Sequence, residues 1–131
     1  MNVTCPVSLG ELVDKITILE IKAERISDPS KLHNVKAELE ALNRTLLETL
    51  PSSDINTLAH FQAELRQINV NLWVIEDDIR NCERKKDFGQ TFIELARAVY
   101  FTNDIRAEVK KKINIKFGSS LVEEKSYNPY A

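Results

Sequence analysis

The sequence predicts an all-α protein, a four-helix bundle built from two antiparallel helical hairpins with extended N- and C-terminal segments. Composition is the first indication: the 131 residues include only three glycines and four prolines, and 29% are charged, which favours helices. The second is the recurrence of apolar residues at alternating spacings of three and four, typical of helices packed lengthwise. The length suits one ordinary domain, so residues 1–131 are expected to form a single helical-bundle domain.

The first helix is predicted at about residues 8–27, where the sequence contains an explicit start signal. Ser8-Leu9-Gly10-Glu11 matches a capping box, in which the Ser8 hydroxyl and the Glu11 carboxylate each accept a hydrogen bond from the other residue's backbone amide. The apolar seam of this helix consists of Leu9, Leu12, Ile16, Leu19, Ala23 and Ile26.

The second helix is predicted at about residues 29–50 and begins at Asp28-Pro29. Aspartate is a good N-cap, and proline suits the first helical position because its missing amide costs nothing there. Its seam consists of Leu32, Val35, Leu39, Leu42 and Leu46. The first two helices therefore form an antiparallel hairpin.

The third and fourth helices are predicted at about residues 54–85 and 88–117. The third has the most regular seam: Leu58, Phe61, Leu65, Ile68, Leu72, Ile75, Ile79 and Cys82. Gly118 is suited to the position just after the end of the fourth helix. The tail, residues 118–131, is too polar and too rich in turn formers to continue as helix. It is expected to be extended, and its tyrosines suit docking either on its own bundle or on a partner.

Helix lengths predict an overhang. At ~1.5 Å per residue the first two helices are about 30 Å long and the last two about 45 Å. Ile18 and Ile21 also lie away from the seam of the first helix, which indicates burial on two faces. A homodimer or higher oligomer would cover these surfaces, and folded-back termini are the alternative.

Charge and motifs exclude several classes of protein. A net charge of −2 argues against a nucleic-acid binder. No segment resembles a signal peptide or a membrane span, so a cytoplasmic location without membrane binding is expected. Cys5 and Cys82 lack metal-type spacing, and Glu11 and Asp14 have no second pair of acids at helical spacing to complete a magnesium site. No cofactor or metal is expected, and catalytic residues remain unknown.

The predicted fourth helix carries polar residues within its apolar face. At about 100° per residue, Asn103, Arg106 and Lys110 fall inside the arc formed by Phe92, Leu95, Ala96, Val99, Ile113 and Phe117. Burying two unpaired cations would cost several kcal/mol, so either acids meet them or this part of the helix faces water. The candidate acids are Glu20 on the first helix and Glu76 on the third.

The resulting candidate ligand-binding cluster is Glu20, Asn69, Trp73, Glu76, Asn103, Arg106 and Lys110. One interpretation is a pocket for an anionic small molecule such as a sugar nucleotide. Arg106 would be the planar fork for phosphate or carboxylate and Lys110 a point charge. Trp73 or Tyr100 would be a stacking wall. The other interpretation is a salt-bridge network that fixes the register of the helices.

Four stretches carry a family resemblance: "SLGELVDKITILEIKAERI", "NLWVIEDDIR", "FIELARAVYFTNDIRAEVKKKIN" and "GSSLVEEKSY". In this order they resemble an uncharacterised family, a domain of unknown function, of small all-helical bacterial and phage proteins. Its members are often encoded near surface-polysaccharide glycosyltransferase genes. The resemblance implies that context but no activity, cofactor or site residue.

The leading functional hypothesis is therefore a non-enzymatic helical interaction or accessory protein with a protein partner. The alternative is a small-molecule binding protein or an enzyme that acts on an anionic ligand at the cluster.

Overall fold

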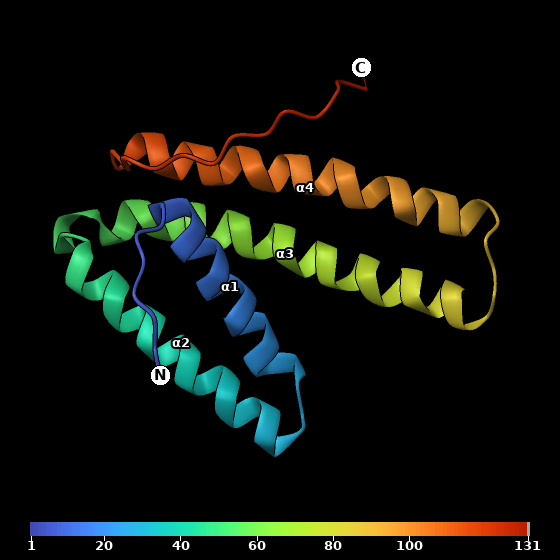
Figure 1. The fold of residues 1–131 in the computed structure, drawn as a ribbon, viewed down its shortest axis with the longest axis horizontal. Helices are drawn as coiled ribbons and strands as arrows, with labels where there is room; N and C mark the ends of the chain where they lie inside the picture. Colours follow the sequence, from blue (N-terminus) through green and yellow to red (C-terminus); the bar gives the residue numbers. More distant parts are fainter. Residues whose placement is uncertain (131) are drawn as a thin grey trace.

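A computed structural model describes residues 1–130, and this part of the chain consists of four α-helices and one short 3₁₀ turn, without strands (Figure 1). The elements are α1 (Leu9–Arg25), α2 (Pro29–Thr49), η1 (Ser52–Asp54), α3 (Ile55–Arg84) and α4 (Gln90–Lys116). The all-α prediction of two helical hairpins with extended termini is confirmed.

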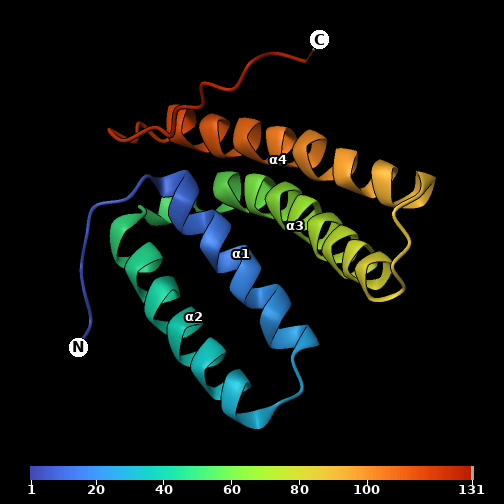
Figure 2. The ribbon, with the colours of Figure 1, turned by 45° about the vertical axis from the view of Figure 1, so that its right-hand side comes forward.

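The two hairpins share one end and diverge from it. α3 and α4 run antiparallel beside each other, whereas the α1–α2 hairpin turns away from them toward its own loop (Figures 1 and 2). α1 packs against each of the other three helices, while α2 packs mainly on α1. α1 is therefore the central helix, which explains why Ile21 on its second face is buried within one chain. Burial of that face requires no second copy.

The two predicted N-caps are present at the starts of α1 and α2. The Ser8 hydroxyl accepts a hydrogen bond from the Glu11 amide at 3.1 Å, and the Asp28 carboxylate accepts one from the Ser30 amide at 3.1 Å. Each satisfies an amide that the first turn of a helix leaves without a partner.

The hydrophobic core lies where α1 crosses the other helices. Its fully buried members Val13, Ile16, Leu65 and Ile113 come from α1, α3 and α4. The remaining buried members are Leu46, Leu58, Ile68 and Val109. The core positions on α3 and α4 all lie in the N-terminal half of α3 and the C-terminal half of α4, so only these halves of the long hairpin share the core with α1.

The other half of the long hairpin extends beyond α1 (Figure 1). We call residues 74–102 the overhang, and all of them lie in the described part of the chain. α3 and α4 contain 30 and 27 residues, against 17 and 21 in α1 and α2. Cys82 is the only buried residue of the overhang. Among helix pairs, the one between α3 and α4 has the most extensive contacts, and these hold the overhang.

None of the helices within residues 1–130 has an apolar stretch long enough to cross a membrane.

Candidate functional site

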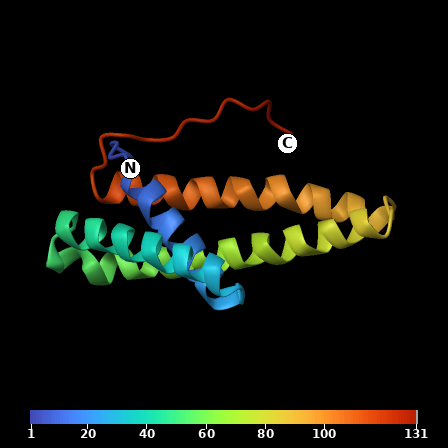
Figure 3. The same cartoon turned by 60° about the horizontal axis from the view of Figure 1, so that its bottom comes forward.

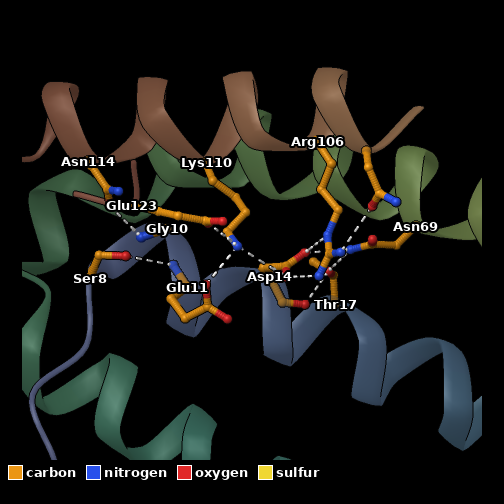
Figure 4. A network of polar contacts seen from close by, with 11 residues as sticks. Ser8, Gly10, Glu11, Asp14, Thr17, Asn69, Arg106, Lys110, Asn114 and Glu123 are labelled. Atoms are coloured by element: carbon orange, nitrogen blue, oxygen red, sulfur yellow. Dashed lines mark hydrogen bonds and ion pairs between the residues drawn. The ribbon is translucent and has the colours of Figure 1, made fainter. Parts of the chain in front are cut away.

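A buried carboxylate, that of Asp14 on α1, is the centre of a polar network between three helices (Figure 4). Its side chain is only 1% exposed. Arg106 of α4 donates Nε–H to Asp14 Oδ1 at 2.9 Å and Nη2–H to Asp14 Oδ2. This two-point arrangement is the strongest geometry for an arginine–carboxylate pair.

Asn69 connects the same carboxylate to α3. Its Nδ2 donates to Asp14 Oδ1 and to Thr17 Oγ1, each at 2.9 Å. The Thr17 hydroxyl in turn donates to the backbone carbonyl of Asp14 at 2.7 Å. The buried polar groups therefore satisfy one another, which a buried network must do to avoid a large desolvation cost.

Lys110, one turn further along α4, is the second cation of the network and is buried. Its side chain is 9% exposed, and its Nζ lies 2.6 Å from Glu11 Oε2, 2.9 Å from Glu123 Oε2 and 3.8 Å from Asp14 Oδ2. Glu123 belongs to the C-terminal tail, so Lys110 joins α1, α4 and the tail (Figure 4).

A close approach of α1 to α4 makes these contacts possible. The Gly10 amide donates to Asn114 Oδ1 at 2.7 Å. A Cβ atom at Gly10 would lie 2.5 Å from the carbonyl oxygen of Lys110. Only glycine permits this distance, and it brings the first turns of α1, with Glu11 and Asp14, against the α4 backbone.

Three groups of the cluster, Arg106, Lys110 and Glu123, have pKa values that the environment moves away from neutrality. The hydrogen bond to Asp14 raises the pKa of Arg106 and outweighs the opposing effect of burial. Burial lowers the pKa of Lys110, but hydrogen bonds to Glu11 and Glu123 outweigh it, so the net shift is upward. The hydrogen bond from Lys110 lowers the pKa of Glu123. Arg106, Lys110 and Glu123 are therefore charged at neutral pH.

Carboxylates outnumber cations in this cluster by three to two. Two cations, Arg106 and Lys110, face the carboxylates of Glu11, Asp14 and Glu123. No free positive charge is left for an anionic ligand at the centre of the network. The network joins three helices at one level of the bundle and sets their register.

The structure contradicts the prediction that Glu20 and Glu76 are the acids that meet the two cations. Glu20 Oε1 accepts a hydrogen bond from Gln62 at 3.1 Å, and Glu76 pairs with Arg80 on the same helix at 3.5 Å. Neither meets Arg106 or Lys110. The reason is the divergence of α1: only its first turns lie beside α4, and Glu20 is too far along the helix.

Glu11, Asp14 and Glu123 are the acids that sequence reasoning missed. The capping box predicts two hydrogen bonds, and the structure shows the one that the Ser8 hydroxyl accepts from the Glu11 amide. The Glu11 carboxylate accepts a hydrogen bond from Lys110 instead. A signal for Asp14 was present: the second buried face of α1 is Gly10, Val13, Asp14, Thr17 and Ile21, at helical spacing. An acid within a face of small and β-branched residues indicates a buried partner cation.

Five of the seven predicted site residues do line one groove, of about 490 Å³, between α1, α3 and α4. They are Asn69, Trp73, Glu76, Asn103 and Arg106. Ile18, Ile21 and Leu72 supply apolar walls. Glu20 and Lys110 lie outside this groove. The Arg106 side chain is 27% exposed, and its Nε and Nη2 are already bound to Asp14.

Within residues 1–130 no group of three or more histidine, cysteine, aspartate or glutamate side chains is arranged to hold a metal ion. The acids of the network are instead each engaged with a cation.

Fold and site together define a small all-α protein whose hairpins are joined by a buried ion-pair network. The chain matches the model of the Family of unknown function (DUF6165) over residues 1–131 and belongs to that family. The resemblance to an uncharacterised family is thus confirmed.

A curated protein also shows similarity. The chain is 27% identical over 100 residues to "Protein bps2" of Acidianus ambivalens. The matched region is 76% of this chain but only 14% of that protein, so this chain spans a small part of its relative. No solved structure matches the chain. Neither the family description nor the relative's name assigns an activity.

Proposed function

We propose that the protein is a non-enzymatic helical accessory protein that pairs with a second copy of itself through the outer face of α4. One observation carries the proposal: a row of side chains spaced four residues apart, Ile93, Arg97, Phe101 and Ile105. We call these residues the α4 row. Its apolar members are 48%, 39% and 56% exposed in chain order. Exposed apolar side chains gathered on one helix face are typical of protein interfaces.

The α4 row is self-complementary. In an antiparallel pair with its twofold axis at residue 99, Ile93 would face Ile105 and Arg97 would face Phe101 of the second copy. A twofold interface requires such reciprocal contacts, and rows of this spacing interdigitate in the commonest class of helix packing. Arg97 already lies 5.7 Å from the Phe101 ring centroid within one chain, a geometry that favours a cation–π contact.

The buried network supports a non-enzymatic role. A general acid or base works best with a pKa near the working pH. The pKa values of Arg106 and Lys110 are raised, and that of Glu123 is lowered. Each shift takes the group further from titration at neutral pH, as expected of residues that hold a structure together.

The family resemblance described above suggests the cellular process in which this protein takes part. Proteins of that kind are often encoded near surface-polysaccharide glycosyltransferase genes, so we place the paired protein beside those enzymes as an accessory component. This link rests on the resemblance alone.

Sedimentation velocity across a range of concentrations tests the pairing. The wild-type chain is expected to shift from monomer to dimer as concentration rises, and Ile105→Lys to remain monomeric at the same concentrations. Ile115→Lys is the matched control, because Ile115 is 69% exposed on the same helix but lies outside the α4 row. A wild-type chain that stays monomeric throughout would overturn the proposal.

The groove supports a second candidate function, binding of an anionic small molecule such as a sugar nucleotide. Trp73 offers a stacking surface there, with Arg80 and Lys22 as further cations at the rim. A sugar nucleotide that binds should raise the melting temperature of wild type by mass action and do so less in Trp73→Ala. Equal or absent shifts in the two proteins would rule this candidate out.

A further inference from the structure

We infer that the C-terminal tail, residues 119–130, is an autoinhibitory strap: seated on α4 of its own chain, it covers part of the pairing face and opposes the association of two copies. This inference rests on the proposed pairing through the α4 row. It adds a means of regulation to that face, because the tail of each copy must leave Phe101 before the two copies can pair there.

The tail runs back along the outside of α4 toward the middle of the helix (Figures 1 and 3). Two side chains anchor it. The Glu123 carboxylate accepts a hydrogen bond from Lys110 Nζ at 2.9 Å, and the Tyr130 hydroxyl donates to Asp104 Oδ2 at 2.5 Å. Both contacts are made within one chain, so the tail is seated on the helix that it follows in the sequence.

The Tyr130 ring lies on a member of the α4 row. Its centroid is 5.0 Å from that of Phe101, with the two rings nearly perpendicular, and 5.4 Å from that of Tyr100. Edge-to-face contact at this distance is a favourable aromatic geometry. Phe101 is two residues, or about 3 Å along the helix, from the proposed twofold axis at residue 99. The tail therefore covers the centre of the pairing face and not its edge.

Seating of the tail and pairing of two copies compete for the same surface. In the antiparallel pair, Arg97 of the second copy would contact Phe101. Helices packed in this way have axes only about 8–10 Å apart, so side chains at the centre of the interface lie directly against each other. The exposed surface of Phe101 cannot contact the Tyr130 ring and a second helix at the same time.

The tail is fastened lightly enough to be released. Among the described residues, its last backbone hydrogen bond runs from the Ser119 amide to the Asn114 carbonyl at 2.8 Å, and residues 120–130 are all exposed. A cavity of about 510 Å³ lies between tail and helix, lined in part by Tyr100 and Tyr127. A segment held through two side chains can be displaced by a second copy that packs along a whole helix face.

Only the anchor at Tyr130 has to open. Lys110, which holds Glu123, is nine residues from Phe101, or about 14 Å along α4. The contact between Glu123 and Lys110 can therefore remain while residues 124–130 move away from the α4 row. Release of the strap leaves the buried network between α1 and α4 intact.

Sedimentation velocity of Tyr130→Ala beside wild type tests the strap in the full chain. Apparent affinity falls when only part of a population is competent to bind, and here both copies must be competent. The apparent dissociation constant of the pair should therefore be about tenfold lower in Tyr130→Ala than in wild type. Tyr127→Ala is the matched control and should pair as wild type does, because Tyr127 is 79% exposed in the same tail and its loss leaves the Tyr130 anchor in place.

The outcomes separate the strap from the pairing. Tighter pairing in Tyr130→Ala but not in Tyr127→Ala is the expected result. Pairing of Tyr130→Ala that is equal to or weaker than that of wild type would overturn the strap and leave the pairing intact. If wild type and Tyr130→Ala both stay monomeric, both proposals are overturned.

Fluorine NMR of Tyr130→meta-fluorotyrosine observes the seat directly. Coupling between two binding events is reciprocal, so a second copy that displaces the tail should convert the signal of the seated ring into that of a released ring as concentration rises. A seated signal that stays constant while sedimentation shows dimers would mean that tail and second copy occupy α4 together, and would overturn the strap.

Discussion

The two halves of the α3–α4 hairpin differ although the same two helices form them. In the inner half, Leu65 and Ile113 are fully buried, because α1 covers the seam between α3 and α4. In the overhang, Val74 and Ile93 are 45% and 48% exposed, since no third helix is present there. The comparison shows that burial along these helices is decided by the reach of α1 and not by their own apolar content.

Charged side chains show the same contrast. In the inner half, Arg106 bonds across helices to a carboxylate that is 1% exposed. In the overhang, Arg80 and Glu76 form a pair within one helix, and their side chains are 76% and 50% exposed. Removing one partner of a buried pair leaves a buried charge without compensation, whereas solvent compensates an exposed one.

Arg106→Met should have the largest effect. It leaves the Asp14 carboxylate buried without its cation, so the free energy of unfolding should fall by about 3–5 kcal/mol. Arg80→Met, on the neighbouring helix and at the rim of the same groove, should change it by less than about 1 kcal/mol. Urea denaturation of both variants measures the difference, and equal losses would show that the network does not stabilise the fold.

Leu65→Ala tests whether apolar side chains stabilise the inner half more than they stabilise the overhang. Leu65 is fully buried in the core, so truncation should cost about 2–5 kcal/mol. Ile93→Ala in the overhang should cost less than about 1 kcal/mol, because solvent already reaches that side chain. Thermal and urea unfolding at low protein concentration should be used, so that pairing does not contribute. A large loss from Ile93→Ala in the monomer would contradict the comparison.

Gly10→Ala tests the close approach that brings α1 to the inner half. A Cβ atom 2.5 Å from the Lys110 carbonyl oxygen must push the helices apart, and the cost should be about 1–3 kcal/mol. Gly89→Ala is the matched control at the tip of the overhang, where the nearest atom is the Asp87 side chain at 3.3 Å. Calorimetry should find a lower melting temperature for Gly10→Ala alone.

The smallest effect is expected at the tail. The hydrogen bond from Lys110 lowers the pKa of Glu123 below its ordinary value of 4.5. Stability from this contact is therefore fully present above pH 4.5 and is lost as pH falls through the lowered pKa. Because Glu123 is 43% exposed, the contribution should be below about 1 kcal/mol.

Amide chemical shifts of residues 121–127 measure this titration by NMR. They should change at acid pH in wild type, and the part of the change that is due to Glu123 should disappear in Glu123→Gln. Lys110 donates to Glu123, and Lys125 and Arg106 add further positive charge nearby. A wild-type tail that titrates at the ordinary glutamate value would contradict the assigned contact.

The sequence was sufficient to predict the helices and the hairpins, because caps and apolar spacing are local signals. Ser8 and Asp28 act as N-caps, as their positions before helical patterns indicate. It was also sufficient to single out Arg106 and Lys110, since two cations within an apolar arc require partners.

The identity of those partners depends on the crossing of α1 over α4, and local spacing contains no information about a crossing angle. Side-by-side helices would bring Glu20 toward the cations, whereas the observed divergence brings Asp14 and Glu11. Glu123 was beyond prediction for a related reason, because its contact depends on the path of an extended tail.

Hydrogen exchange measured along α3 and α4 as a function of protein concentration tests the central claim most directly. At low concentration, amides of residues 74–102 should exchange faster than those around Leu65 and Ile113, because only the inner half is covered by α1. As concentration rises, protection should increase in α4 around the α4 row and stay constant around Leu65. Equal protection of the two halves at low concentration, or protection that never changes with concentration, would contradict the account.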